Sequence, residues 1–148
     1  MSNGKPTAIV DAMVSERRFD VLGIGNAIVD VIAHAEDAFL SENSLNKGTM
    51  TLIDGTEAAE LYGRMGASVE SSGGSAANTI AGLSALGGKG SFIGKVRDDQ
   101  LGGIFRHDIR AAGVSFETSA ASDGQHTARC LIFVTPDGQR LLINTSNK

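Results

Sequence analysis

The chain has 148 residues, of which 41% are hydrophobic and 20% are charged, and its formal net charge is -4 at pH 7. A chain of this size forms about one domain with an adequate core, and this composition argues against both wholesale disorder and a membrane-spanning protein. Neither acidic nor basic residues form long runs, so we expect no binding to nucleic acid and none to a membrane surface.

Residues 1–18 contain Lys5, Asp11 and Glu16, which interrupt any apolar stretch and argue against a signal peptide. We therefore predict that residues 1–18 form a flexible N-terminal tail. Cys130 is the only cysteine, so no intramolecular disulfide can form, and this favours a cytoplasmic location.

Residues 19–33 are rich in β-branched side chains and are interrupted by Gly23 and Gly25. This pattern predicts one buried central strand that bulges or admits a ligand. The Gly-x-Gly spacing also resembles part of a dinucleotide-binding loop. That alternative is excluded because Ile28 occupies the third glycine position and the apolar strand pattern continues.

Asn26 and Asp30 are the two polar residues inside this apolar run. On a regular strand both lie on one face, about 13 Å apart, so they could bind different ends of one small molecule. An unpaired carboxylate among valines is costly to bury. Asp30 is therefore expected to bind a ligand or, alternatively, to cap a neighbouring helix or turn.

The next elements are a helix over residues 36–43, a strand over 48–53 and a second helix over 57–65. A turn at residues 54–56 caps the second helix. This helix has one apolar face, made of Ala58, Leu61, Tyr62 and Met65. We interpret it as scaffold.

Gly73 and Gly74 lead into a helix of small residues that ends at residues 87–88. With few side chains at its start, a ligand could approach the backbone and meet the free N–H groups of the first turn. Asn78 adds a donor and an acceptor. The alternative is a helix that packs tightly on a sheet through Ala77, Ala81 and Ala85.

Residues 92–96 predict a strand. Asp98 or Asp99 is expected to cap the amphipathic helix that follows, and this helix is expected to end at Gly113. His107 is expected to face solvent. Residues 127–134 and 139–145 are β-rich and flank a Thr-Pro-Asp-Gly sequence suited to a type I turn, which predicts a hairpin.

Two motifs, Gly-Gly-Ser-Ala-Ala-Asn at residues 73–78 and Gly-Asn-Ala-Ile-Val-Asp at residues 25–30, resemble those of the ribokinase or pfkB family of carbohydrate and nucleoside kinases. The resemblance implies an α/β fold: a ribokinase-like sheet with flanking helices and a small β-lid. Residues 19–148 would form its N-terminal portion only, with lid strands at roughly 47–53 and 126–145.

The resemblance also implies roles for individual residues. It assigns acceptor binding to Asn26, Asp30, Gly73, Gly74, Ser75 and Asn78. It further implies that Arg140 contacts the transferred phosphate, although an exposed hairpin charge is the alternative. Arg97 departs from the family pattern, where many members have glycine.

Kinase chemistry requires a site for the triphosphate and a base near the acceptor hydroxyl. The sequence contains no Gly-x4-Gly-Lys-Ser/Thr loop and no second glycine-rich loop carrying an aspartate. In the family these parts lie in the C-terminal half of a longer chain. We therefore expect this chain to contain no catalytic residue and no metal site. The ATP and Mg²⁺ sites are expected to lie mainly outside these residues, and the chain alone is expected to be inactive.

A carboxylate only accepts hydrogen bonds, so Asp30 suits two neighbouring hydroxyl groups of a polyol. Residues 39–50 resemble the adenosine-kinase-like branch, which implies an adenosine-like nucleoside as the acceptor and Met50, Leu52 and Cys130 as its base pocket. Ordinary strand packing is the alternative for Met50. The alternatives are a kinase for ribose, fructose or a related sugar, and a non-catalytic binding or dimerising module. Open edges of the lid could pair two copies into a homodimer.

Overall fold

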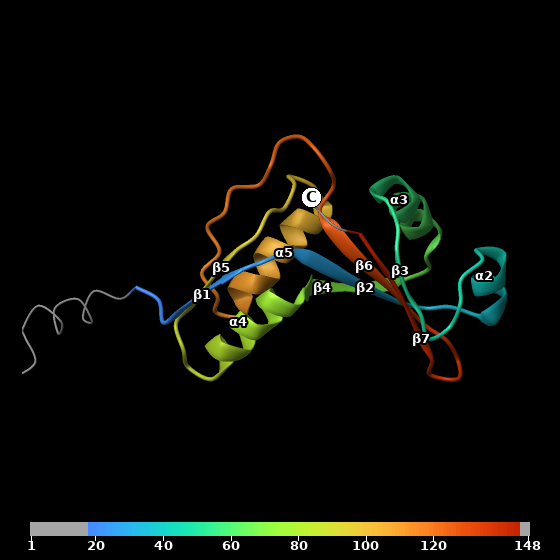
Figure 1. The fold of residues 1–148 in the computed structure, drawn as a ribbon, viewed down its shortest axis with the longest axis horizontal. Helices are drawn as coiled ribbons and strands as arrows, with labels where there is room; N and C mark the ends of the chain where they lie inside the picture. Colours follow the sequence, from blue (N-terminus) through green and yellow to red (C-terminus); the bar gives the residue numbers. More distant parts are fainter. Residues whose placement is uncertain (1–17, 146–148) are drawn as a thin grey trace, which may run out of the picture.

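The structure is a computed structural model that describes residues 18–145, so the predicted tail lies outside the described residues except for Arg18. It contains two sheets (Figure 1). The first pairs β1 (Val21–Ile24) with β5 (Gly90–Ile93) in parallel. The second has the strand order β3-β7-β6-β2-β4 and is called the lid sheet below.

The strands of the lid sheet are β2 (Ile28–His34), β3 (Met50–Leu52), β4 (Ser68–Gly73), β6 (Ala128–Val134) and β7 (Arg140–Asn144). The helices are α2 (Asp37–Glu42), α3 (Gly55–Arg64), α4 (Ser75–Ala85) and α5 (Gln100–Ala111). This is the α/β architecture of a sheet with flanking helices that the sequence predicted. Within residues 18–145, none of the helices combines the length and the apolar character needed to span a membrane.

The prediction of one continuous strand over residues 19–33 is wrong. The chain breaks between Ile24 and Ile28, so β1 and β2 belong to different sheets. Gly23 of β1 and the following Gly25 allow α4 to pack closely, because a Cβ at Gly23 would lie 2.6 Å from Cγ1 of Ile80 and one at Gly25 2.9 Å from Cβ of Ala76. Gly25 donates the last hydrogen bond to β5, and the chain then leaves that sheet. Asn26 therefore lies in the break and not on a regular strand face with Asp30.

Strand β4 had no counterpart in the sequence prediction. Its sequence, Ser-Val-Glu-Ser-Ser-Gly, has a single β-branched residue and lacks an apolar alternation. It forms a strand because it pairs antiparallel with β2, from Ile28 opposite Gly73 to Ala33 opposite Ser68. Tertiary pairing overrides weak local preference here.

The two faces of the lid sheet differ. One face buries Val29, Val31 and Phe133 beneath α2 and α3, and the Phe39 and Phe133 rings lie 5.3 Å apart. The opposite face, called the open face below, exposes apolar side chains around Asp30. These exposed residues are Ile32, Met50, Leu52 and Val69.

Helix α4 packs against β1 and β5, whereas helix α5 packs against β4 and β2 of the lid sheet (Figure 1). Phe92 of β5, Phe105 of α5 and Phe116 form a buried cluster with ring centroids 5.4 to 6.0 Å apart. The buried residues of both parts form one connected hydrophobic core. This core holds the two sheets together where β1 passes into β2.

Local sequence signals account for the helix starts and the hairpin. Asp54 accepts hydrogen bonds from the N–H groups of Thr56 and Glu57 at the start of α3, and Asp99 caps α5 through the N–H of Gly102. In the hairpin turn the N–H of Gly138 donates to the carbonyl of Thr135 at 2.8 Å. The structure confirms, to within a few residues, the predicted helices over residues 36–43 and 57–65 and the predicted hairpin.

Candidate functional site

The carboxylate of Asp30 lies against Gly73 of the adjacent strand β4, two residues along from Ser71, with which Asp30 pairs. A Cβ at Gly73 would lie within 2.8 Å of all three carboxyl atoms of Asp30. Only a residue without a side chain therefore fits opposite this carboxylate. The antiparallel pairing of β2 with β4 brings together the strand aspartate and the glycine pair that the sequence had marked separately.

Gly74 is the N-cap of α4, and its backbone requires glycine. Its φ angle is 95°, a conformation that other residues rarely adopt, and a Cβ there would lie 2.9 Å from the carbonyl oxygen of Asn26. The hydrogen-bond ladder of α4 begins with the N–H of Asn78 donating to Gly74 O at 2.8 Å. The N–H groups of residues 75–77 precede this ladder, beside Asp30 and Gly73.

Asp30 is half-buried, and within residues 18–145 it forms no ion pair. Burial raises the pKa of its carboxyl above the ordinary value. The neighbouring Cys130 thiol is buried, and burial together with the Asp30 charge raises its pKa to about 11. A carboxylate with these surroundings is poised to accept hydrogen bonds from a ligand that brings its own donors.

One row of paired residues crosses the lid sheet through Asp30. Asp30 of β2 pairs with Cys130 of β6, Cys130 pairs with Asn144 of β7, and Asn144 pairs with Leu52 of β3. Met50 lies two residues from Leu52 on the same strand, and both are about 70% exposed (72% and 68%). The predicted base-pocket residues Met50, Leu52 and Cys130 therefore lie on the same face as Asp30.

Other predicted site residues lie at different distances from Asp30. Ser75 and Asn78 are exposed in the first turn of α4, next to Gly74. Arg140 is exposed at the opposite end of β7 from Asn144, about 13 Å along the strand. The structure thus brings the Asp30 and glycine-pair elements together and places Arg140 at the far end of the lid sheet.

Sequence reasoning missed Asn144 and a hollow at the carboxyl ends of β1 and β5. The hollow is lined by Gly25, Gly94 and Lys95, together with residues 118–123. Carboxyl ends of parallel strands are common ligand sites. A Cβ at Gly94 would lie 2.9 Å from Gly25 O, so a second glycine pair shapes the backbone beside Asn26. The Gly94–Lys95 sequence directly after a strand was the available signal.

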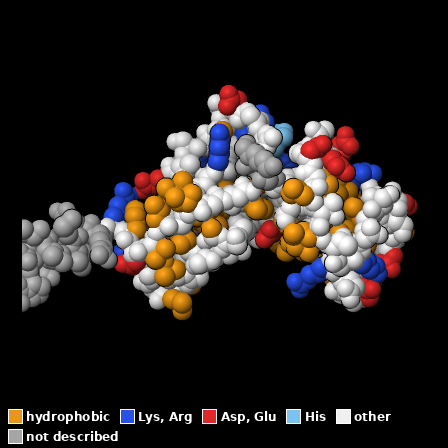
Figure 2. Space-filling view, in the orientation of Figure 1, with side chains coloured by type: hydrophobic (Ala, Val, Ile, Leu, Met, Phe, Trp, Pro, Cys, Tyr) orange, Lys and Arg blue, Asp and Glu red, His pale blue; other side chains and the backbone are white. Residues whose placement is uncertain are grey.

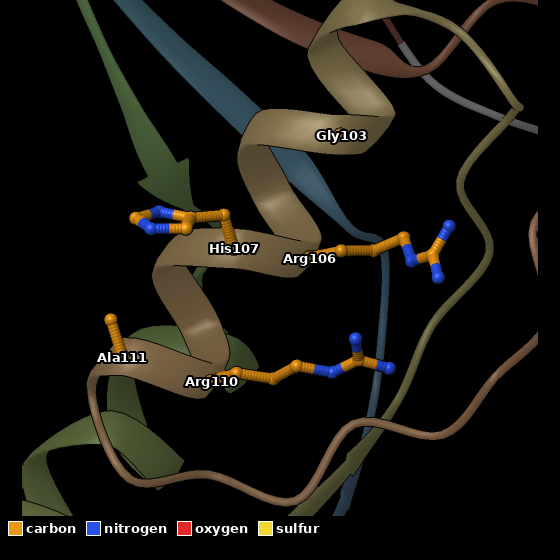
Figure 3. A pocket seen from close by; sticks show the side chains of 5 residues that line it. All are labelled: Gly103, Arg106, His107, Arg110 and Ala111. Atoms are coloured by element: carbon orange, nitrogen blue, oxygen red, sulfur yellow. The ribbon is translucent and has the colours of Figure 1, made fainter.

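A separate hollow lies on the surface of α5 (Figure 3). It is lined by Arg106, His107 and Arg110 with small residues between them, and Arg106 and Arg110 extend to the side opposite His107. Arg110 donates to the Phe116 carbonyl at 2.9 and 2.7 Å. This hollow shares no residue with the surroundings of Asp30, so we do not include it in the candidate site.

Arg97 and the histidines have local roles in the structure. Arg97 donates to the Gly124 carbonyl at 2.9 Å, which fixes the loop before β6. His107 is exposed as predicted and lies beside Asp108. In the part of the chain that the structure describes, no three His, Cys, Asp or Glu side chains are grouped as metal ligands. We therefore assign no metal ligand among the described residues.

Comparison with known proteins gives a consistent result for sequence and structure. The model of the pfkB family of carbohydrate kinases matches residues 24–148. The solved structure of an adenosine kinase from Sinorhizobium meliloti is 55% identical, with a TM-score of 0.75 over 87% of this chain and 39% of that chain. A probable sugar kinase from Rhizobium etli CFN 42 is 52% identical, with a TM-score of 0.74 over 86% of this chain and 39% of that chain.

Among curated proteins, a probable fructokinase-2 from Arabidopsis thaliana is 32% identical over 112 residues, which cover 68% of this chain and 32% of that protein. The chain therefore spans about a third of this curated relative and 39% of the two solved structures. The family match covers most of the described residues, including both motifs around Asp30 and Gly73. The chain belongs to the pfkB family of carbohydrate kinases.

Proposed function

We propose that this chain provides the acceptor-binding part of an ATP-dependent kinase that phosphorylates a hydroxymethyl group of an adenosine-like nucleoside. The observation that carries the proposal is the half-buried carboxylate of Asp30, which lies against Gly73 where α4 begins. It can accept hydrogen bonds from two neighbouring hydroxyl groups, as in a ribose. The 55% identity to a protein described as an adenosine kinase supports a nucleoside as the acceptor.

The residues around Asp30 have complementary roles in this proposal. The backbone N–H groups of residues 75–77 and the amide of Asn78 favour acceptor oxygens and negative charge at the start of α4. Asn26 contributes its polar side chain from the break between β1 and β2. The exposed apolar residues Met50 and Leu52 provide the surface on which a base would pack.

ATP and Mg²⁺ supply the phosphoryl group and its charge neutralisation in kinases of this chemistry. We assign no residue between 18 and 145 as the base or as a nucleotide ligand, and the absence of a catalytic residue from this chain stays a prediction. The role of Arg140 as a phosphate contact stays a prediction. It requires the far end of the lid sheet to lie near the transferred group.

A kinase for fructose or another sugar is the second candidate. It is favoured by the 32% identity to a probable fructokinase over 112 residues, and the same carboxylate of Asp30 would then hold sugar hydroxyls. A non-catalytic or dimerising module is the third. Because α2 and α3 cover one face of the lid sheet, pairing of two copies would use its open face or its edge strand β3.

Phosphorylation assays with adenosine, inosine, ribose and fructose test the proposal. We expect the 148-residue chain to bind an acceptor without transferring phosphate, and any longer polypeptide from the same gene to phosphorylate adenosine fastest. Phosphate transfer by the 148-residue chain alone would contradict the assignment of the catalytic parts to other residues. Sedimentation of the same sample determines whether two copies associate.

A further inference from the structure

The open face of the lid sheet carries an amide that lacks good hydrogen-bond partners. The side chain of Asn144 is partly buried, and its Oδ1 is fully shielded from solvent without a hydrogen-bond partner. Its Nδ2 donates to the Sδ atom of Met50 at 3.6 Å, and a thioether sulfur is a weak acceptor. Leaving a shielded amide in this state costs folding free energy, so its presence requires an explanation.

Asn144 is aligned with the predicted acceptor site. Asn144 pairs with Cys130, and Cys130 pairs with Asp30, so the three residues lie in one row across β7, β6 and β2. Adjacent strands are about 4.8 Å apart, which separates the backbones of Asn144 and Asp30 by about 10 Å. Leu52 continues the row on β3 and is exposed. A ligand on this face can therefore contact a carboxylate at one end and an amide at the other.

This spacing favours a ligand of two linked rings. A ligand whose hydroxyl groups bind Asp30 must extend across Cys130 to reach Asn144. A single sugar ring is too short for that span, whereas a sugar that carries a planar base can cover it. Met50 and Leu52 are exposed apolar neighbours that a base could cover. The middle of the row is a buried thiol, which suits the apolar face of such a ring.

We propose that Asn144 recognises the base of the acceptor by hydrogen bonding to a 6-aminopurine edge; this inference rests on the proposed nucleoside kinase function. When the Asn144 side chain turns away from its weak contact with Met50, its amide presents a donor and an acceptor side by side, which match the ring nitrogen N7 and the amino group N6 of adenine. A 6-oxopurine presents two acceptors at the same edge and would leave the Asn144 carbonyl unpaired. Asn144 therefore determines specificity for an aminopurine nucleoside over an oxopurine nucleoside or a free sugar.

Calorimetric titration tests this assignment, using the 148-residue chain and any longer polypeptide that its gene encodes. The ligands are adenosine, inosine, ribose and purine riboside, which is adenosine without the 6-amino group. We expect the unmodified protein to bind adenosine about 10-fold or more tightly than purine riboside. We expect Asn144→Leu to abolish that preference and to leave ribose affinity unchanged.

Asn43→Leu is a matched control, because the Oδ1 of Asn43 is also buried without a partner but lies at the end of α2, on the covered side of the lid sheet. It should leave the ratio of adenosine to purine riboside affinity unchanged. The comparison of the two ligands in the unmodified protein decides the question even where Asn144→Leu does not fold.

Equal affinity for adenosine and purine riboside would overturn the assignment, as would an equal loss of ribose and adenosine binding in Asn144→Leu. In either case, binding of ribose by the unmodified protein would leave the proposed kinase function in place. Failure of all four ligands to bind would overturn the proposed function itself, and the role of Asn144 with it.

Discussion

The lid sheet and the β1–β5 sheet both expose apolar surface, but the chemistry of the two surfaces differs. The open face of the lid sheet surrounds a carboxylate and an amide, Asp30 and Asn144, with apolar side chains. The β1–β5 sheet instead exposes Leu22, Ile24 and Ile93, at 53%, 72% and 43%, and the register places no charged side chain among them. Figure 2 shows hydrophobic side chains gathered over this part of the molecule.

This difference separates two meanings of an exposed sheet face. Parallel sheets are ordinarily covered on both faces, so the bare apolar face of β1 and β5 is typical of a surface on which further protein packs. A face with a few convergent polar groups is typical of a small-molecule site. This difference is the basis on which we propose ligand binding for the lid sheet and packing for the β1–β5 sheet.

The largest predicted effect is on the buried aromatic cluster beneath β5. Phe105→Ala removes a fully buried ring that contacts Phe92 and Phe116, and should lower the free energy of unfolding by about 3–5 kcal/mol. Phe39→Ala in the lid part should cost less, because Phe39 is only partly buried. Chemical denaturation measures both. Equal losses of unfolding free energy in the two variants would contradict the difference in packing that the structure indicates between the two parts.

Gly74→Val should strongly reduce acceptor binding and also destabilise the chain. The positive φ angle disfavours a branched residue by about 1–3 kcal/mol, and the new Cβ would approach Asn26 O. Gly82→Ala in the same helix is the matched control, since a Cβ there meets no atom within 4 Å. That control should raise helix stability by about 0.5–1 kcal/mol. Normal acceptor affinity in Gly74→Val would disprove the role of the glycine pair.

Asp30→Asn should weaken acceptor binding by about 1–3 kcal/mol, because charge-assisted hydrogen bonds become neutral ones. The same substitution should raise the melting temperature near neutral pH. Burial raises the folded-state pKa of Asp30 above its ordinary value of 3.8, so the folded state binds the proton more tightly than the unfolded state. The stability associated with the protonated form is present at low pH and is lost as pH rises through the raised pKa.

The melting temperatures of Asp30→Asn and the unmodified chain should therefore converge at low pH and separate as pH rises past that pKa. A cap role for Asp30 predicts the reverse, a destabilised variant with normal acceptor affinity. Melting curves across pH together with calorimetric titration distinguish the two roles.

The smallest effect concerns the bare face of the β1–β5 sheet. Ile24→Lys places a charge on a residue that is 72% exposed, and should reduce self-association of the 148-residue chain with little change in its melting temperature. Light scattering of the two proteins measures the difference. A large loss of stability would show that Ile24 is packed in the folded chain and is not part of an exposed surface.

The sequence alone predicted the elements whose signals are local. Asp54 and Asp99 cap their helices as predicted, because an N-cap bonds to backbone groups two or three residues away. The hairpin turn at residues 135–138 follows from proline and glycine at fixed turn positions. Asp30 was marked by the cost of a carboxylate in an apolar run, and the resemblance to a kinase family added the glycine pair to the same site.

Only the tertiary structure decided how these parts meet. The break between β1 and β2 and the strand β4 depend on which distant strands pair, and neither is encoded in a local pattern. The contact of Asp30 with Gly73 follows from one antiparallel register, and the row that joins Asp30 to Asn144 follows from two more. Strand pairing connects residues that are far apart in the chain, so a short sequence motif carries no information about which polar side chain will lie beside it.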